Sequence, residues 1–185
     1  MNKAQLTVLA GPTAVGKGTV VAALKERYPT LNVSVSATTR DPRPGELNGV
    51  HYYFVSAHEF DAMIERGDML EWALVHGKNK YGTPRGPVDE ALAAGKPVLL
   101  EIDLAGARQV RTNRPDAQFI FLAPPSWEEL ERRLIGRGTE GTEEQARRLA
   151  TARVELEAAS EFDHVVINDD VERAVDELAR LIGLE

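Results

Sequence analysis

The feature that most constrains the fold of this chain is a short apolar strand that leads directly into a glycine-rich loop and then a helix-forming run. The strand covers residues 5–10, and the loop from Gly11 to Lys17 has two glycines separated by four residues and followed by a lysine. In such a loop backbone N–H groups surround a polyphosphate, while the helix N-terminus and the lysine supply positive charge. The pattern predicts a phosphate-binding loop, and a turn that serves only strand–helix packing is the open alternative.

The loop departs from the usual pattern at one position. Gly18 stands where most such loops have a serine or threonine that binds Mg²⁺, and the first hydroxyl group comes one residue later, at Thr19. The metal and phosphate contacts at this point of the loop are therefore open, with Thr19 as the candidate ligand.

Composition limits the classes of protein to consider. A length of 185 residues, 43% hydrophobic and 28% charged, is typical of one globular domain. The net charge of −7, from 22 basic and 29 acidic residues, disfavours nonspecific binding of nucleic acid, which needs a basic surface. Arginines nevertheless cluster at 40–43, 132–137 and 147–153, as expected for local sites that bind an anionic ligand.

The sequence shows no sign of export or membrane insertion. There is no cysteine, and the first strand begins too close to the N-terminus to leave room for a signal peptide. No apolar run approaches the roughly 18–20 residues of a membrane span. We expect a cytoplasmic protein with neither nucleic-acid nor membrane partners.

Strands and helices alternate along most of the chain. Apolar or β-branched runs predict strands at 5–10, 31–39, 98–103, 118–122 and 164–167. Helical periodicity predicts helices at about 17–28, 105–113, 126–136 and 170–182. The alternation predicts an α/β fold of three layers, in which helices cover both faces of a parallel five-stranded core sheet.

Two stretches interrupt this alternation. Residues 36–86 hold strands at 51–55, 70–75 and 81–82 and a helix with a capping box at Ser56 and Glu59, which predicts a small mixed α+β lobe. Residues 133–148 are rich in arginine and glycine and poor in apolar residues, which predicts a mobile flap before a long helix from Thr142 to about 160. Within a single domain of residues 1–185, the expected parts are a core (about 1–35, 87–126 and 160–185), a lobe (about 36–86) and a lid (about 127–159).

Arg40 and Arg43 are candidates for binding a phosphate. They lie in a loop that Pro42, Pro44 and Gly45 stiffen, and guanidinium groups on a stiff loop suit bidentate recognition of a phosphate. A solvated loop with surface ion pairs is the alternative.

Two acidic residues are candidates for binding a base or a metal. Glu71 interrupts an apolar strand beside Trp72, where it either faces solvent or accepts hydrogen bonds from the N1–H and exocyclic amine of a guanine. Asp103 ends a buried strand at the sheet edge where parallel sheets bind ligands. It can hold Mg²⁺ directly or through water, cap the following helix, or do both.

Arg133, Arg137 and Arg148 flank the predicted flap. They are either surface charges paired with nearby glutamates, or guanidinium groups that a lid brings onto transferring phosphates.

These segments together resemble the guanylate kinase family, in the family's order, over about residues 6–170. The most specific match is the run Ser-Ala-Thr-Thr-Arg-Asp-Pro-Arg-x-Gly-Glu-x-Asn-Gly from Ser36 to Gly49. The other matching segments are 11–17, Tyr52-x-Phe54-Val55, Leu70–Ala73, Tyr81–Thr83, Glu101–Asp103, Ala123–Ser126, Gly136–Thr139 and Ile167–Asp169.

The resemblance implies a kinase that transfers the γ-phosphoryl group of ATP to GMP, and to dGMP, with Mg²⁺ as cofactor. The implied catalytic residues are Lys17, Arg43, Arg133, Arg137 and Arg148. The implied ATP-binding residues are Gly11, Pro12, Thr13, Ala14, Val15, Gly16, Lys17, Gly18, Thr19, Arg133, Arg137 and Asn168. The implied GMP-binding residues are Ser36, Arg40, Arg43, Tyr52, Glu71, Tyr81, Thr83 and Asp103, with Asp103 and Thr19 as candidate metal ligands.

Two alternatives to this function are less well supported by the residues. Lys17-Gly18-Thr19 resembles the loop of adenylate kinases, but the Glu71 carboxylate would repel the ring nitrogens of adenine. Non-catalytic modules that resemble guanylate kinase bind phosphopeptides, and they typically lack the loop lysine and the lid arginines that this chain has.

Overall fold

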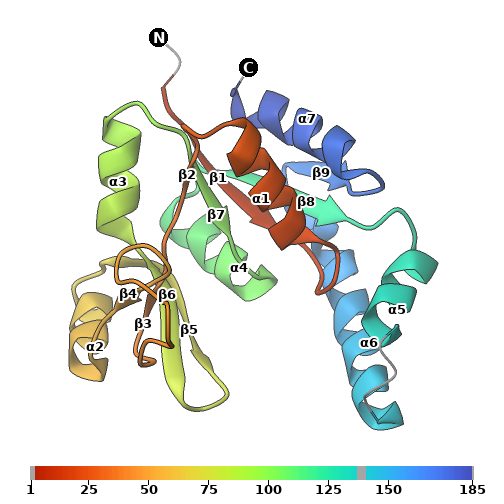
Figure 1. The fold of residues 1–185 in the computed structure, drawn as a ribbon, viewed down its shortest axis with the longest axis horizontal. Coiled ribbons are helices and arrows are strands. Elements are labelled where there is room, and N and C mark those ends of the chain that lie inside the picture. Colours follow the sequence, from red (N-terminus) through yellow and green to blue (C-terminus); the bar gives the residue numbers. More distant parts are fainter. Residues whose placement is uncertain (1–2, 137–140, 185) are drawn as a thin grey trace.

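A computed structural model describes residues 3–136 and 141–184. Its core is a parallel sheet of five strands in the order β2-β7-β1-β8-β9 (Figure 1). The strands are β1 (Leu6–Ala10), β2 (Asn32–Val33), β7 (Val98–Glu101), β8 (Gln118–Ala123) and β9 (His164–Ile167). Every residue of the central strand β1 is buried, because helices cover both of its faces, and this explains its unbroken apolar run. The predicted five-stranded parallel sheet is confirmed.

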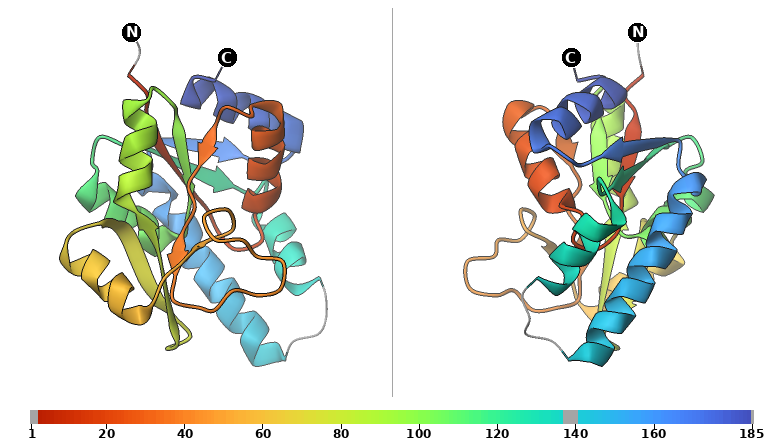
Figure 2. Two further views of the ribbon diagram at one scale, coloured as in Figure 1. Left: turned by 60° about the vertical axis from the view of Figure 1, so that its left-hand side comes forward. Right: turned by 90° about the vertical axis from the view of Figure 1, so that its right-hand side faces the viewer.

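Helices cover the core sheet on both faces and give the fold three layers (Figure 2). On one face α1 (Lys17–Arg27) and α7 (Val171–Ile182) share a hydrophobic core with β1, β8 and β9. On the other face α3 (Arg85–Ala93) and α4 (Leu104–Asn113) pack against β1 and β7. The sequence pattern does not predict α3, since Val88 and Ala91 are its only buried residues.

The segment predicted as one strand over residues 31–39 is divided between two sheets. Its first part, β2, pairs with β7 in the core, and its second part, β3 (Ala37–Thr38), pairs with strands of a smaller sheet. The prediction of a single strand is therefore wrong. The reason is that side-chain alternation is the same whichever sheet a strand joins, so only long-range pairing reveals the division.

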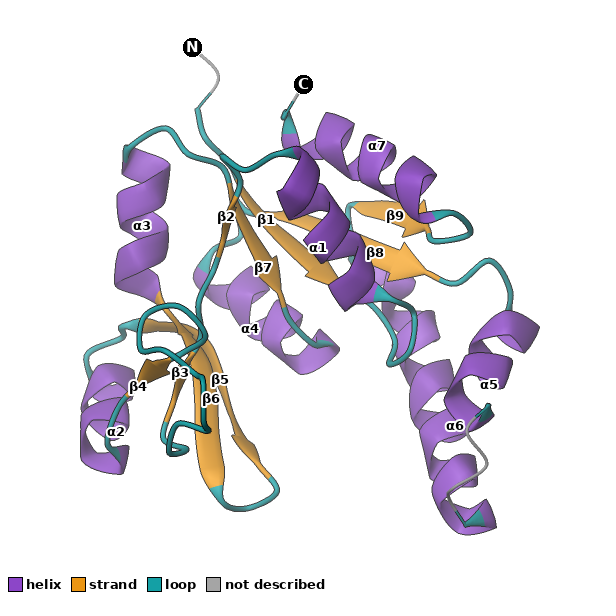
Figure 3. Ribbon diagram, viewed as in Figure 1, coloured by secondary structure: helices purple, strands orange, loops and turns teal. Residues whose placement is uncertain are grey.

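The smaller sheet has the strand order β4-β3-β6-β5, with one parallel pair and two antiparallel pairs (Figure 3). Its other strands are β4 (Tyr53–Phe54), β5 (Met69–Val75) and β6 (Asn79–Pro84). Helix α2 (Ala57–Glu65) packs on it through Phe60, and the Ser56 hydroxyl accepts the Glu59 N–H, which confirms the predicted N-cap.

Two further helices extend from the core on the side away from the smaller sheet (Figure 1). They are α5 (Trp127–Ile135) and α6 (Thr142–Glu157), which continues into a 3₁₀ turn at Ala158–Glu161. Leu130, Leu134 and Ala152 join them in a small apolar cluster of their own. The predicted flap of residues 133–148 includes 137–140, which lie outside the described residues, so its mobility stays a prediction. In the part of the chain described here, no helix has the length and apolar character needed to cross a membrane.

Candidate phosphoryl-transfer site

The glycine-rich loop connects the carboxyl end of β1 to the N-terminus of α1. Gly16 caps the helix in the left-handed region at φ 95°, where a side chain would be strained, and Ala14 also has a positive φ of 69°. The Val15 N–H closes a turn onto the carbonyl of Pro12 at 3.2 Å. This geometry leaves the N–H groups at the start of α1 available to an anion, as a phosphate-binding loop requires.

Lys17 lies in the first turn of α1 and its ammonium group points back across the loop. Its Nζ donates to the carbonyls of Ile102 at 3.2 Å and of Gly11 at 3.4 Å. Burial lowers the pKa of Lys17, while the carboxylates of Glu101, Glu155 and Asp103 act in the opposite direction. Among the described residues, the hydrogen bonds of this half-buried ammonium group go to carbonyl oxygens, so it is suited to a phosphate ligand, which would pair with its charge directly.

Two side chains from distant parts of the chain support the loop at one carbonyl. The Val15 oxygen accepts from Asn168 Nδ2 at 2.8 Å and from Arg133 Nη1 at 3.2 Å. Asn168 is only 6% exposed, so its hydrogen bond to the loop is buried in the protein rather than facing solvent. Arg133 also pairs with Glu129 one helical turn earlier, at 3.3 Å. Helix α5 is thus attached directly to the loop.

Arg148, another of the predicted lid arginines, lines a cavity of about 420 Å³. Its lining is Thr13 of the loop, Leu134 of α5, and Glu144, Arg147, Arg148 and Thr151 of α6. Arg148 Nη2 is 3.7 Å from Glu144 Oε1, which agrees with the surface-pair alternative for this arginine. Arg137, the third predicted lid arginine, lies outside the described residues.

On the other side of the site, Glu71 and Thr83 form a buried pair. They face each other across β5 and β6, and the Thr83 hydroxyl donates to Glu71 Oε1 at 2.7 Å. The pairing register shifts between Met69 and Glu71, and Glu71 is 9% exposed although it belongs to an outer strand. Burial raises the pKa of Glu71, with a further contribution from Asp103, while the Thr83 hydrogen bonds lower it. The solvent-facing alternative for Glu71 is therefore wrong.

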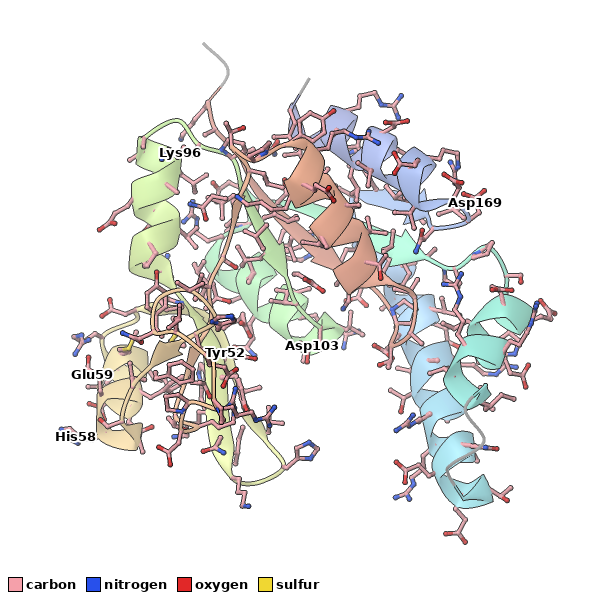
Figure 4. The ribbon with its side chains drawn as sticks, viewed as in Figure 1. Tyr52, His58, Glu59, Lys96, Asp103 and Asp169 are labelled. Carbon is pink, nitrogen blue, oxygen red and sulfur yellow. The ribbon has the colours of Figure 1, made fainter. Side chains whose placement is uncertain are left out.

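Asp103 lies between the loop and the smaller sheet, at the start of α4 (Figure 4). Its Oδ1 accepts from the Gly106 N–H at 2.7 Å, so the helix-cap alternative is correct. The residue is exposed and has a second carboxylate oxygen, which leaves a metal role open as well.

Arg40 lies in a cluster of aromatic side chains near the smaller sheet. Its guanidinium is 5.3 Å from the Tyr52 ring centroid, and the Tyr52 and Tyr81 rings are 6.0 Å apart. Nη1 and Nη2 of Arg40 each donate to one oxygen of Glu46, at 2.9 and 3.0 Å. This pairing, together with the Arg43 N–H, lowers the pKa of Glu46 to about 2.

Ser36 and Arg43, which are also predicted to bind GMP, differ in how the structure holds them. The Ser36 carbonyl accepts from Tyr53, which attaches Ser36 to the smaller sheet. The Arg43 side chain is exposed and makes no hydrogen bond or ion pair within the described residues, although its charge helps to lower the pKa of Glu46, so it is available to a ligand.

Three acidic residues near the site are absent from the sequence-based prediction. Glu46 holds Arg40, and Glu101 ends β7 close to Gly18. Glu155 lies on α6, and its Oε1 is buried without a hydrogen-bond partner among the described residues. Burial raises the pKa of Glu155, while the Thr13 backbone and the charge of Lys17 act in the opposite direction. Glu46 is in the matching motif and was signalled by it. Glu101 is also within a matching segment, Glu101–Asp103, whereas Glu155 looks like an ordinary polar position in sequence.

Comparison with known proteins identifies the family. The family model described as guanylate kinase matches residues 3–185. The chain belongs to the guanylate kinase family. A guanylate kinase of Leifsonia xyli is 61% identical over 98% of this chain and 71% of its own, and one of Rhodococcus jostii is 58% identical over 98% and 88%.

Solved structures agree with this membership. A crystal structure of guanylate kinase from Anaplasma phagocytophilum superposes with a TM-score of 0.74 at 32% identity, covering all of this chain and 87% of its own. A shikimate kinase from Bacteroides thetaiotaomicron, with a TM-score of 0.50 at 15% identity, shares the fold alone. The sequence-based resemblance to guanylate kinases is confirmed, and the protein is a nucleotide-binding enzyme of the kinase class.

Proposed function

We propose that this guanylate kinase family member transfers the γ-phosphoryl group of ATP to GMP and releases ADP and GDP. The observation that carries the proposal is the buried Glu71 carboxylate, positioned by Thr83, in a protein that also has a phosphate-binding loop. A buried carboxylate accepts hydrogen bonds, and guanine presents two adjacent donors, its N1–H and exocyclic amine. Adenine presents no such pair.

The acceptor nucleotide is expected to bind between β5 and the loop that carries Arg40 and Arg43. Glu71, with Ser36, Thr83 and Asp103, would contact the base. The phosphate would meet Arg40, Arg43, Tyr52 and Tyr81. Support comes from the Glu46 pairing, because it fixes the Arg40 guanidinium beside the two tyrosines before any ligand binds.

ATP is expected to bind at the loop, with its phosphates on the N–H groups of residues 11–19 and on Lys17. Arg133, Arg137 and Arg148 would reach the transferring phosphate from the lid, and Asn168 would border the adenine. Support comes from the contact of Arg133 with Val15 and from the cavity between the loop and α6.

Phosphoryl transfer needs alignment and charge stabilisation more than covalent help. The acceptor is a phosphate oxygen that is already anionic near neutral pH, so no general base is required. Lys17 and the lid arginines would stabilise the charge that spreads over the transferring group. Closure of the lid over the loop would also exclude the water that hydrolyses ATP.

The donor set near the loop fits a magnesium ion. Mg²⁺ usually binds through substrate phosphates and one or two carboxylates, and Asp103, Glu101 and the Thr19 hydroxyl lie at this edge of the sheet. The described residues contain no cluster of three acidic or histidine side chains that would hold a metal alone, which agrees with a site shared with substrate. When bound, the ion neutralises charge on the β- and γ-phosphates. Use of dGMP and a cytoplasmic location remain predictions.

A coupled assay of ADP release tests the proposed function. With ATP and Mg²⁺ present, GMP should support rapid turnover, and AMP and CMP should support little. Equal turnover of AMP would contradict the base assignment. The adenylate kinase alternative would then be favoured, whereas a complete lack of turnover with any nucleotide would favour a binding module.

Gly18→Ser tests the unusual loop position. A Cβ at Gly18 would have its nearest neighbour, Glu101 Oε1, at 3.9 Å, so the variant should fold normally. A serine hydroxyl there should lower the Mg²⁺ concentration for half-maximal activity by about three- to tenfold, the effect of one added polar contact. A magnesium titration of the initial rate measures this. An unchanged midpoint would show that the hydroxyl is dispensable in this loop.

A further inference from the structure

Helix α4 makes direct hydrogen bonds to the strand that carries Glu71. β5 is an outer strand of the smaller sheet, so alternate backbone groups along one edge have no partner strand. The Gln109 side-chain amide pairs with both backbone groups of Trp72: Oε1 accepts its N–H at 3.0 Å, and Nε2 donates to its carbonyl at 2.9 Å. Asn113 Nδ2 donates to the carbonyl of Leu70 at 2.8 Å. The two residues on either side of Glu71 are thus both held by α4.

The same face of α4 also contacts the Glu71 side chain. Asp103, Gly106, Gln109 and Asn113 are spaced by three or four residues and therefore lie along one side of the helix. A Cβ at Gly106 would lie 3.1 Å from Glu71 Oε2 and 3.1 Å from Asp103 Oδ1, so glycine is what allows the carboxylate to approach the helix. The helix therefore contacts the Glu71 carboxylate and holds the flanking backbone.

We propose that Gln109, assisted by Asn113, is a positioning residue for guanine recognition. The two amide side chains fix the strand segment Leu70–Trp72 so that the Glu71 carboxylate faces the base. The inference rests on the proposed function. Unlike a carboxylate, an amide side chain offers a donor and an acceptor side by side at neutral pH, as the two Trp72 backbone groups require. Without it both groups lose their partner and the edge of β5 separates from α4.

The test is steady-state kinetics of Gln109→Leu with GMP and with IMP, a nucleotide that lacks the exocyclic amine of guanine. We expect KM for GMP to rise about tenfold and KM for ATP to stay within about twofold. The ratio of kcat/KM for GMP to that for IMP should fall at least about fivefold, because a displaced carboxylate no longer distinguishes the amine. A simple loss of stability would not change this ratio.

The matched control is Thr112→Val, because Thr112 is exposed on the same helix and, among the described residues, its hydroxyl hydrogen-bonds only to the carbonyl of Arg108. The KM values of this variant and its GMP/IMP ratio of kcat/KM should equal those of wild type. A folded Gln109→Leu with an unchanged GMP/IMP ratio would overturn the inference, as would equal losses for GMP, IMP and ATP.

If Gln109→Leu fails to fold, the same measurements on Asn113→Leu decide the question, with a smaller fall of the ratio expected and an unchanged ratio contradicting the inference. Turnover of GMP by the wild-type enzyme separates a failure of this inference from a failure of the proposed function.

Discussion

Glu71→Gln is expected to lower kcat/KM for GMP on the order of 10³-fold, since each hydrogen bond to a charged acceptor is worth about 1.5–3 kcal/mol and two are weakened or lost. A glutamine would present an N–H₂ group to a base that itself offers donors. KM for ATP should change little, because ATP binds on the other side of the site. The control is Glu65→Gln, an exposed glutamate on α2.

The same substitution is expected to stabilise the free protein at pH values above the raised pKa of Glu71. Burial raises the pKa of Glu71 above its ordinary value of 4.5, so folding favours the protonated form. The contribution of this carboxyl group to stability is therefore fully present below pH 4.5 and is lost as pH rises through the raised pKa. Glutamine is neutral at every pH and can still accept from Thr83.

Two measurements check these expectations for Glu71. The melting temperature of Glu71→Gln should exceed that of wild type at pH 8, and the difference should shrink toward pH 4. In wild type, kcat/KM for GMP should fall as pH drops through the raised pKa, and the variant should lack this effect. A variant that is less stable at pH 8, or that retains wild-type preference for GMP over AMP, would contradict the assignment.

Lys17→Met is expected to reduce kcat on the order of 10³-fold, the typical cost of removing a charged group that stabilises a transition state. Met has a similar length without the charge, so the fold should be preserved. Burial lowers the pKa of Lys17, which means that the protein destabilises its charged form. We therefore expect the melting temperature of the variant to be at least that of wild type.

Single-turnover transfer from ATP to GMP measures the effect of Lys17→Met on chemistry. The control is Lys96→Met, an exposed lysine at the far end of the core (Figure 4). Loss of activity together with a lower melting temperature would point to a structural role for Lys17. A kcat within about tenfold of wild type would contradict its role in phosphate stabilisation.

The core of the fold was predictable because it depends on local patterns. Strands of a parallel sheet that is covered on both faces are continuous apolar runs, and β1 and β8 are of this kind. The pairing of residues 31–39 with two different sheets was not predictable, because register and partner are long-range properties. Helix α3 was missed because most of its surface is exposed.

The candidate site was predictable where a residue conflicts with its surroundings. Glu71 interrupts an apolar strand, and Lys17 follows a glycine pattern that packing alone does not require. Gln109 and Glu155 lie on helices among other polar residues, where sequence gives no sign of a partner. Their contacts depend on how two elements distant in sequence pack together.

The division of residues 31–39 has a consequence for how the two sheets are joined. Ser34 donates its N–H to Leu99 of the core, whereas the Ser36 carbonyl accepts from Tyr53 of the smaller sheet. Only Val35 lies between these two residues, and a single residue has two soft torsion angles. At this junction the backbone between the two anchored groups is therefore limited to φ and ψ of Ser34, Val35 and Ser36, and the β-branched Val35 among them prefers extended backbone.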